Sequence, residues 1–267
     1  MTTFYYNKVI WITGASSGIG RGMALYLNQI GNCTLILSAR RKELLQMLAR
    51  ECSNVKAHVL PLDMEDFSQA SHWVKKALEL AGRIDILINN AGIGQLGNSL
   101  DTLDEVEEKI MKINYFGNVA LSKAVCRYFI ENSIHGQIVV ISSVLGQFSQ
   151  PRLATYAASK HALYGYYEGF REEVRKYGIR IQIVSPGFIQ TDVTLNSLTP
   201  DGKKLNKNSP AQEKGMSTET FAKKLSKVII KKKEHAYIGG PEILAAYFKR
   251  FLPDFFYFLM RKFVFKT

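Results

Sequence analysis

The amino-acid sequence predicts a doubly wound α/β fold, in which a parallel sheet of about seven strands carries helices on both faces. Two observations lead to this prediction. Short and almost continuously apolar runs alternate along the chain with longer segments whose apolar residues have helical spacing. Such runs are typical of strands buried on both faces, and their alternation with helices predicts parallel crossover connections. The length of 267 residues suits a single domain of this class.

The predicted elements follow one another without an internal repeat or a linker. Strand-like runs cover residues 9–13, 33–38, 55–60, 84–89, 137–142, 179–185 and 236–238. Helical periodicity covers residues 19–30, 43–52, 67–81, 103–131, 155–177 and 218–232. Residues 192–215 are irregular and rich in Asn, Ser, Lys and Pro, and a loop this long in a compact domain is usually functional. We expect this segment to form a lid over a substrate site.

The charge of the chain is concentrated near its C-terminus. Of a net charge of +12, residues 200–267 carry +9, because they hold 15 Lys and Arg against 6 Asp and Glu. A basic surface of this kind attracts nucleic acid, an anionic membrane or an anionic cofactor, or it is simply solvated. The sequence has no zinc-finger spacing, no aromatic RNA-binding signature and no basic helical arm, so we expect no nucleic-acid partner.

The cysteines and the N-terminal residues indicate the type of cellular compartment in which the protein is found. Three cysteines are an odd number and none has CxxC spacing, which argues against a disulfide framework and against a metal site. Residues 1–7 are polar and aromatic, and the first strand-like run begins directly afterwards, so we expect no signal peptide. Both features favour an intracellular, reducing compartment.

The first predicted strand leads into a glycine-rich turn and then into a helix. The turn reads Thr-Gly-Ala-Ser-Ser-Gly-Ile-Gly over residues 13–20. Glycines allow a tight turn and let the backbone approach a pyrophosphate, while the helix N-terminus offers free N–H groups and a positive dipole end. The alternative is an ordinary glycine-rich connection, but the position after an apolar N-terminal strand favours a phosphate site.

The second predicted strand ends in two arginines, Arg40 and Arg41. In dinucleotide-binding folds, an acidic residue at this strand end binds the adenosine ribose 2′-hydroxyl, whereas an arginine accommodates a 2′-phosphate. No Asp or Glu stands here. A guanidinium suits a phosphate well, so the pair favours NADP(H) over NAD(H). The alternative is an exposed basic start of the next helix.

A reactive pair lies on the helix over residues 155–177. Tyr156 and Lys160 are four residues apart and therefore share one helix face. An ammonium group close to a phenol favours the phenolate and lowers the phenol pKa. Ser142 and Ser143 close the preceding strand at its carboxyl end, where doubly wound folds bind their ligands. Taken alone, the Tyr-x-x-x-Lys pair could also be an exposed pair on a helix surface with no catalytic role.

Together these features resemble the short-chain dehydrogenase/reductase family. The matching features, in chain order, are residues 13–20, the sequence Asn-Asn-Ala-Gly over residues 89–92, Ser143, Tyr156 with Lys160, and Pro186-Gly187 followed by Thr191. They span about two thirds of the chain at the spacing usual in the family. The resemblance implies a Rossmann-type fold and hydride transfer between a nicotinamide cofactor and a carbonyl or alcohol carbon.

The resemblance also implies residue roles in the reaction. Tyr156 would be the general acid in reduction and the base in oxidation, Lys160 would lower its pKa and hold the nicotinamide ribose, and Ser143 would orient the substrate oxygen, with Ser142 the less favoured neighbour. Asn114 matches a helix asparagine that holds a water molecule in the family's proton relay. From the residues alone, Asn114 is only a polar residue in a helix.

The cofactor contacts follow from the same resemblance. Asp63 matches a residue at the adenine edge, Asn90 matches the wall of the adenosine pocket, and Ile189 and Thr191 match contacts to the nicotinamide carboxamide. The complete expected set is Gly14, Ser16, Ser17, Gly18, Ile19, Gly20, Arg40, Arg41, Asp63, Asn90, Tyr156, Lys160, Ile189 and Thr191.

Within the family, several stretches look closest to the dehydrogenase/reductase member 7-like and 11β-hydroxysteroid dehydrogenase-like microsomal members. Residues 37–41, 144–146 and 158–163 carry this similarity. It implies an apolar substrate such as a steroid, a retinoid or a lipid ketone. The features that favour a reducing compartment, together with the basic aromatic tail, lead us to expect a location in the cytosol or on the cytoplasmic face of the endoplasmic reticulum membrane. The helices over residues 103–131 and 155–177 match those that form dimers in the family, so we expect a homodimer or tetramer.

The C-terminal tail, residues 244–267, is both aromatic and basic. Nine aromatic residues lie between residues 244 and 265, with Lys and Arg among them. An interfacial helix needs an apolar, aromatic face and a basic polar face, so peripheral contact with an anionic membrane is one hypothesis. The alternative is a helix that packs over the pocket or in a subunit interface. We separate this tail from an NADP-binding catalytic domain over residues 1–243.

The sequence therefore predicts an NADP(H)-dependent oxidoreductase that interconverts a carbonyl and an alcohol. The rival hypothesis is a non-catalytic NADP(H)-binding module that regulates a partner at a membrane surface. The intact set of Ser143, Tyr156 and Lys160 argues against this rival.

Overall fold

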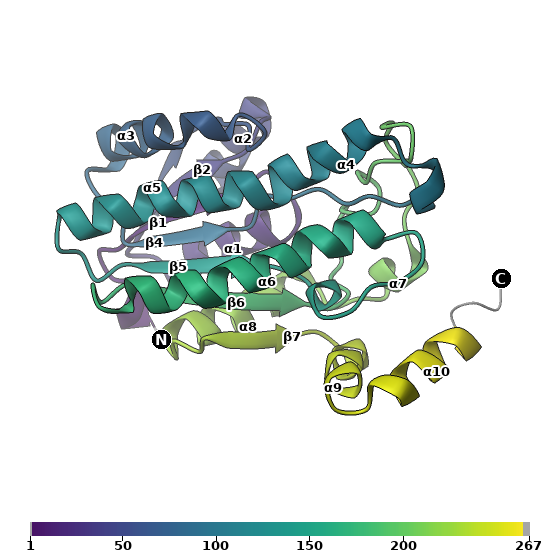
Figure 1. Cartoon of the computed structure of the whole chain (residues 1–267). Coiled ribbons are helices and arrows are strands. Elements are labelled where there is room, and N and C mark those ends of the chain that lie inside the picture. The colour runs from purple at the N-terminus through teal and green to yellow at the C-terminus, as the bar shows by residue number, and fades with distance from the viewer. Residues whose placement is uncertain (1, 264–267) are drawn as a thin grey trace.

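The computed structural model describes residues 2–263 and confirms the predicted architecture (Figure 1). The strands form a single parallel sheet in the order β3-β2-β1-β4-β5-β6-β7. Their bounds are β1 (Val9–Thr13), β2 (Thr34–Ser38), β3 (Lys56–Val59), β4 (Ile86–Asn89), β5 (Gln137–Ile141), β6 (Arg180–Pro186) and β7 (His235–Ile238). The strand order reverses between β1 and β4, and such a switch point opens a crevice at the carboxyl ends of the strands.

Helices cover both faces of the sheet. They are α1 (Gly18–Ile30), α2 (Lys42–Glu51), α3 (Ala70–Ala81), α4 (Asp104–Met111), α5 (Gly117–Glu131), α6 (Ala154–Arg175), α7 (Pro210–Glu213), α8 (Thr218–Ile230), α9 (Leu244–Phe251) and α10 (Pro253–Phe263). In Figure 1, α4, α5 and α6 lie in front of the sheet and α1 and α8 lie behind it. The single helix predicted over residues 103–131 is interrupted by a π-helical turn over Lys112–Phe116, which separates α4 from α5.

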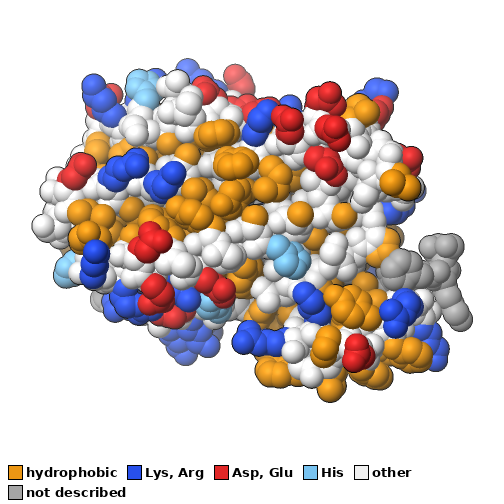
Figure 2. Space-filling model, viewed as in Figure 1, with side chains coloured by type: hydrophobic (Ala, Val, Ile, Leu, Met, Phe, Trp, Pro, Cys, Tyr) orange, Lys and Arg blue, Asp and Glu red, His pale blue; other side chains and the backbone are white. Residues whose placement is uncertain are grey.

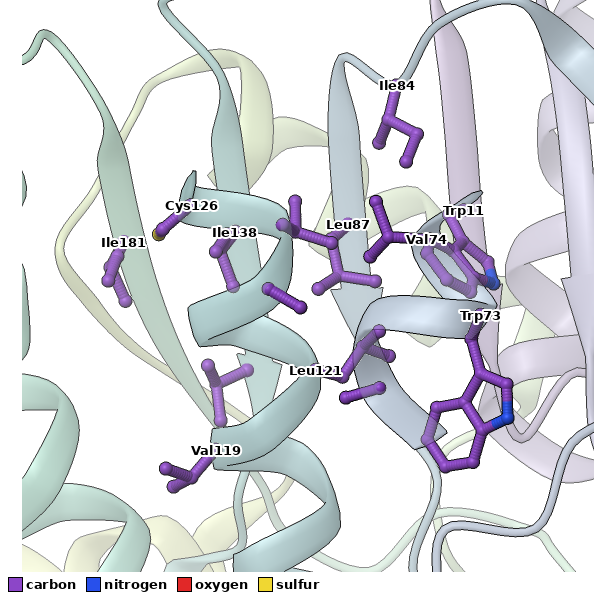
Figure 3. Packing of buried hydrophobic residues seen from close by; sticks show 14 of the residues in the cluster. Trp11, Trp73, Val74, Ile84, Leu87, Val119, Leu121, Cys126, Ile138 and Ile181 are labelled. Atoms are coloured by element: carbon purple, nitrogen blue, oxygen red, sulfur yellow. The ribbon is translucent and has the colours of Figure 1, made fainter. Parts of the chain in front are cut away.

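The sheet lies between two apolar cores because successive side chains of a strand point to opposite faces. In β1, Val9 and Trp11 belong to the core that faces α3, α5 and α6, while Ile10 and Ile12 belong to the core that faces α1, α2 and α8. Figure 3 shows the first core, in which Trp11 and Leu87 of the sheet lie near Trp73 of α3 and Leu121 of α5. Strands buried on both faces explain the nearly unbroken apolar runs of the sequence.

The segment 192–215 is irregular apart from the short helix α7. It contacts the loop that follows β4, since the backbone N–H of Leu96 donates to the carbonyl of Leu198 at 2.9 Å and the N–H of Leu198 donates to Gly94 at 3.0 Å. It therefore lies at the carboxyl end of the sheet, where the prediction of a lid requires it. A cavity of about 510 Å³ lies between this segment and α1.

The described part of the tail forms α9 and α10, which lie beyond the carboxyl end of β7 (Figure 1). One side of these helices packs on the protein: Ala246 and Phe256 are buried, and the Phe256 ring lies 5.4 Å from the Phe148 ring. Among the described residues, no helix has the length and apolar character needed to cross a bilayer. Residues 264–267 of the predicted tail, with Phe265, lie outside the described residues.

Candidate active site

The glycine turn joins β1 to α1 in a conformation that requires glycine. Gly14 and Gly18 have positive φ angles of 63° and 54°, which non-glycine residues seldom adopt. A Cβ on Gly20 would lie 2.4 Å from the Gly14 carbonyl oxygen, so the backbone closes tightly on itself. The Ser17 side chain makes no cap hydrogen bond, and the first N–H groups of α1 are therefore open to an anion.

Asn90 and Thr13 brace this turn. The Asn90 side-chain amide donates to the carbonyls of Thr13 at 3.0 Å and Gly14 at 3.2 Å. The Thr13 hydroxyl accepts the backbone N–H groups of Asn90 and Ala91, both at 3.0 Å. The loop after β4 is thus fastened to the turn after β1. The sequence places Thr13 in the motif but does not reveal this bracing, because the bonds join residues about 77 positions apart.

The two arginines after β2 lie next to the glycine turn. Both are exposed, and a terminal nitrogen of Arg41 lies 3.4 Å from the Ser16 hydroxyl. Asp63 follows β3, and its carboxylate accepts the backbone N–H of Glu65 at 3.1 Å. The residues after the first three strands therefore share one edge of the sheet, as expected for parallel strands.

Ser143, Tyr156 and Lys160 converge beyond β5. The Ser143 hydroxyl hydrogen-bonds the Tyr156 phenol, and the Lys160 ammonium lies 5.8 Å from the centre of the Tyr156 ring. Lys160 is buried and donates to the carbonyl of Ile141 at 3.1 Å. Ser142 has a different role, because its buried hydroxyl donates to the Lys160 carbonyl at 3.2 Å.

Burial has the largest effect on the ionisation of this pair. It lowers the pKa of Lys160 from 10.5 to about 8, because an ammonium loses hydration. It also raises the pKa of Tyr156, and the Ser143 hydrogen bond offsets part of that rise. A phenol with a raised pKa is protonated at neutral pH. That Lys160 lowers this pKa stays a prediction.

Asn114 lies in the π-helical turn and is completely buried. Its side chain accepts the N–H of Ile93 at 2.8 Å and donates to the Ile93 carbonyl at 2.9 Å and to the Ser159 hydroxyl at 3.0 Å. A Cβ on Gly92 would lie 3.1 Å from the Asn114 oxygen and 3.5 Å from the Lys160 ammonium. Asn114 is therefore close to the reactive group, with its side chain engaged in holding the loop after β4.

The loop after β6 brings Ile189 and Thr191 to the same edge. Ile189 is buried, and the Thr191 methyl group would lie 3.1 Å from a Cβ on Gly18. A residue that the sequence does not single out, Gln212 of α7, donates its side-chain amide to the Ile189 carbonyl at 2.6 Å and to the Thr191 hydroxyl at 3.1 Å. A lone glutamine in an irregular segment carries no sequence signal for such a contact.

Comparison with known protein families agrees with this arrangement. A family model described as short chain dehydrogenase matches residues 8–201. The chain belongs to the short chain dehydrogenase family. Members of this family are oxidoreductases that bind a nicotinamide dinucleotide and act on small substrates, usually as oligomers. Within the described residues, no cluster of His, Cys, Asp and Glu could hold a metal ion.

Relatives within the short chain dehydrogenase family match nearly the whole chain. A dehydrogenase/reductase SDR family protein 7-like from Anopheles gambiae is 38% identical over 96% of this chain and 83% of its own length. Dehydrogenase/reductase SDR family member 7 from Homo sapiens is 36% identical over 96% of this chain and 77% of its own. These names agree with the subgroup that the sequence motifs indicate.

Solved structures of the family share the fold. A short chain dehydrogenase/reductase from Burkholderia phymatum, in complex with NAD, has a TM-score of 0.83 at 21% identity and covers 94% of this chain and 95% of its own. An alcohol dehydrogenase from Thermococcus sibiricus, complexed with 5-hydroxy-NADP, has a TM-score of 0.72 at 24% identity and covers 88% of this chain and 97% of its own. The same fold therefore accepts either nicotinamide dinucleotide.

Proposed function

We propose that the chain is an NADP(H)-dependent oxidoreductase that interconverts a carbonyl and an alcohol, with Tyr156 as the proton donor and acceptor. The observation that carries the proposal is the convergence of Ser143, Tyr156 and Lys160 beside an uncapped, glycine-rich helix N-terminus. A dinucleotide fits this edge, because the open N–H groups of α1 suit its pyrophosphate and the glycines leave room for it.

The chain's own residues supply the acid–base chemistry. When bound, the nicotinamide would supply or accept the hydride. The Ser143 hydroxyl and the Tyr156 phenol are neighbours, so both could hydrogen-bond to one oxygen of the substrate. Tyr156 is protonated at neutral pH because burial raises its pKa, which suits the acid needed for carbonyl reduction. We assign to Lys160 the role of holding the nicotinamide ribose. We assign to Asn114 the role of holding a water molecule in the proton relay.

The preference for a 2′-phosphate rests on Arg40 and Arg41. Both guanidiniums are exposed at the end of β2, and Arg41 reaches Ser16 in the glycine turn. An Arg–phosphate pair is charge-assisted, so loss of one guanidinium should weaken NADPH binding about tenfold or more and leave NADH binding almost unchanged. Isothermal titration of Arg40→Asp and Arg41→Asp with both cofactors tests this assignment, with Arg50→Asp, an exposed position at the far end of α2, as a matched control.

If neither Arg40→Asp nor Arg41→Asp changes the ratio of the NADPH and NADH dissociation constants, the assignment of the 2′-phosphate fails.

We propose four further cofactor contacts on the same grounds: Asp63, Asn90, Ile189 and Thr191. They follow three different strands, β3, β4 and β6, and lie at the carboxyl edge of the sheet. Asn90 would act mainly through the glycine turn, since its amide is bonded to the carbonyls of Thr13 and Gly14.

Activity itself is tested by following NADPH consumption with a panel of steroid, retinoid and lipid ketones. We expect apolar carbonyls to be reduced, because the lid over residues 192–215 and the aromatic tail flank the site. The rival non-catalytic module predicts that the chain binds NADPH and consumes it with no member of the panel. Turnover that disappears in Tyr156→Phe would exclude this rival.

The tail supports a second proposal, that the enzyme docks on an anionic membrane. The exposed residues of α9, of α10 and of the connection between them are largely apolar: Leu244, Phe248, Phe251, Leu252, Phe255, Tyr257 and Phe258. Phe251 is 70% exposed. Basic residues lie among them, and Figure 2 shows the apolar cluster with blue side chains around it. Aromatic and basic side chains on one surface suit a bilayer of negative lipids.

Flotation with phosphatidylserine vesicles tests the docking. Phe251→Ser combined with Phe255→Ser should abolish flotation without unfolding the chain, because both side chains point to solvent. Met47→Ser, which removes a 56% exposed apolar side chain from α2, is the control that should still float. Vesicle binding that survives the double substitution, or self-association that the substitution abolishes, would show instead that the surface meets another part of the protein or a second copy.

Other parts of the proposal concern assembly and location. Figure 2 shows apolar side chains gathered over α5 and α6, the helices that the family uses for dimers, so we propose a homodimer or tetramer through this face. We keep the division into a catalytic domain over residues 1–243 and a docking tail over residues 244–267. The proposed location is the cytosol or the cytoplasmic face of the endoplasmic reticulum membrane.

A further inference from the structure

The short helix α7 of the lid is fastened to the loop after β6 almost entirely by polar contacts. It has four residues and none of them is buried. The Gln212 amide donates to the Ile189 carbonyl at 2.6 Å and to the Thr191 hydroxyl at 3.1 Å. A second amide, from Gln190, donates to the backbone carbonyl of Glu213 at 3.0 Å. Little apolar burial opposes the release of this helix.

The group that Gln212 presents is a primary carboxamide. A nicotinamide ring carries the same group, and the proposed function assigns the carboxamide contacts to Ile189 and Thr191, the residues that Gln212 engages. One NH₂ group at 2.6 Å and 3.1 Å from these acceptors leaves no room for a second NH₂ group in the same position. The Gln212 side chain and a nicotinamide carboxamide would therefore exclude each other.

We propose that Gln212 mimics the nicotinamide carboxamide and controls cofactor affinity, an inference that rests on the proposed function. In the structure, Gln212 satisfies the acceptors on Ile189 and Thr191 and holds α7 against the loop. When a nicotinamide cofactor is bound, Gln212 gives up both acceptors and α7 leaves this position. The cavity of about 510 Å³ between α1 and the lid, which Gln212 itself lines, provides space for this movement.

The contact of Gln212 with Ile189 and Thr191 acts as a latch. It reduces the apparent affinity for the cofactor, because the cofactor can bind only after Gln212 is released. Cofactor binding must break two neutral hydrogen bonds, so we expect the latch to lower the apparent cofactor affinity about tenfold. The reduction applies only to ligands that carry the nicotinamide ring. A ligand that stops at the ribose leaves the acceptors to Gln212 and does not compete with it.

The test compares NADPH with 2′-phospho-ADP-ribose, which lacks nicotinamide, by isothermal titration. Gln212→Ala should bind NADPH about tenfold more tightly than the unmodified chain and bind 2′-phospho-ADP-ribose equally well. Gln190→Ala is the matched control, because it also removes a glutamine amide that holds α7 but leaves Ile189 and Thr191 engaged. This variant should bind 2′-phospho-ADP-ribose as the unmodified chain does and should tighten NADPH binding less than Gln212→Ala, because it loosens α7 but leaves both acceptors occupied.

Three results would overturn the proposal: unchanged or weaker NADPH binding by Gln212→Ala, equal tightening for both ligands, or equal tightening in Gln190→Ala. If the unmodified chain binds neither ligand, the proposed function itself fails and the latch fails with it. If the unmodified chain binds both ligands and Gln212→Ala leaves the NADPH dissociation constant unchanged, the latch alone is rejected.

Hydrogen exchange gives a second readout that does not depend on activity. The backbone N–H groups of Gln212, Gly215 and Met216 are hydrogen-bonded to Ser209, Gln212 and Phe188. Saturating NADPH should accelerate exchange in residues 209–216, while saturating 2′-phospho-ADP-ribose should leave it unchanged. Exchange that NADPH slows, or that both ligands accelerate equally, would contradict the release of α7.

Discussion

Removal of the Asn114 side chain should destabilise the fold far more than its small size suggests. The amide, which is itself completely buried, makes two part-buried hydrogen bonds to Ile93 and one buried hydrogen bond to Ser159. Asn114→Ala removes all three hydrogen bonds, at a cost of about 1 kcal/mol each. The higher helix propensity of alanine returns about 0.5 kcal/mol. We therefore expect a net loss of about 2 to 3 kcal/mol in the free energy of unfolding.

Urea unfolding at a fixed protein concentration measures this loss. Asn132→Ala is the matched control, because its amide makes one exposed hydrogen bond to the Tyr128 carbonyl at 2.9 Å. That variant should lose less than about 0.5 kcal/mol, as is usual for a surface position. A loss below about 1 kcal/mol for Asn114→Ala, or equal losses in the two variants, would refute the assignment of Asn114 as a buried anchor of the site.

Three further predictions follow from burial and charge. Burial lowers the pKa of Lys160 to about 8, so above this pH the unfolded chain binds a proton that the folded chain has released. The stability of the unmodified chain relative to Lys160→Met should therefore rise by about 2 kcal/mol between about pH 7 and pH 9.5, and a constant difference would contradict the burial of the ammonium. Burial also raises the pKa of all three thiols, so a disulfide reagent at about pH 8 should modify none of them until the chain is denatured. These thiols are Cys33, Cys52 and Cys126. The Glu242 carboxylate accepts the N–H groups of Phe188 at 2.8 Å and Gly240 at 2.9 Å, so Glu242→Ala should cost about 1 to 2 kcal/mol in urea unfolding; an unchanged midpoint would show that this anchor contributes nothing.

The sheet and its helices could be predicted because local pattern determines them. A strand buried on both faces needs an unbroken apolar run, and β1 reads as one from Val9 to Thr13. The π-helical turn at Asn114 could not be predicted, because the residues around it have ordinary helical periodicity. Its cause is tertiary: the amide must reach Ile93, which lies 21 positions earlier in the chain.

The candidate site shows the same limit. The spacing of Tyr156 and Lys160 predicts that they share a helix face, but only the structure shows that burial governs their pKa values. Nothing near Gln212 in the sequence indicates its partners, since the contact joins it to residues 21 and 23 positions away across two loops. For the tail, the sequence leaves packing and membrane contact as alternatives. In the structure one side packs through Phe256 and another side leaves Phe251 exposed.

The most direct test of the central claim is the NADPH-dependent reduction of an apolar carbonyl by the unmodified chain and by Tyr156→Phe. The variant lacks only the phenolic hydroxyl, which is one of many expected cofactor contacts, so it should still bind NADPH with a dissociation constant within about fivefold of the unmodified value. Its kcat/KM should fall by about a hundredfold to ten-thousandfold, the usual contribution of a general acid. A Tyr156→Phe enzyme that reduces the same carbonyl within about tenfold of the unmodified rate would contradict the assignment of Tyr156 as the proton donor.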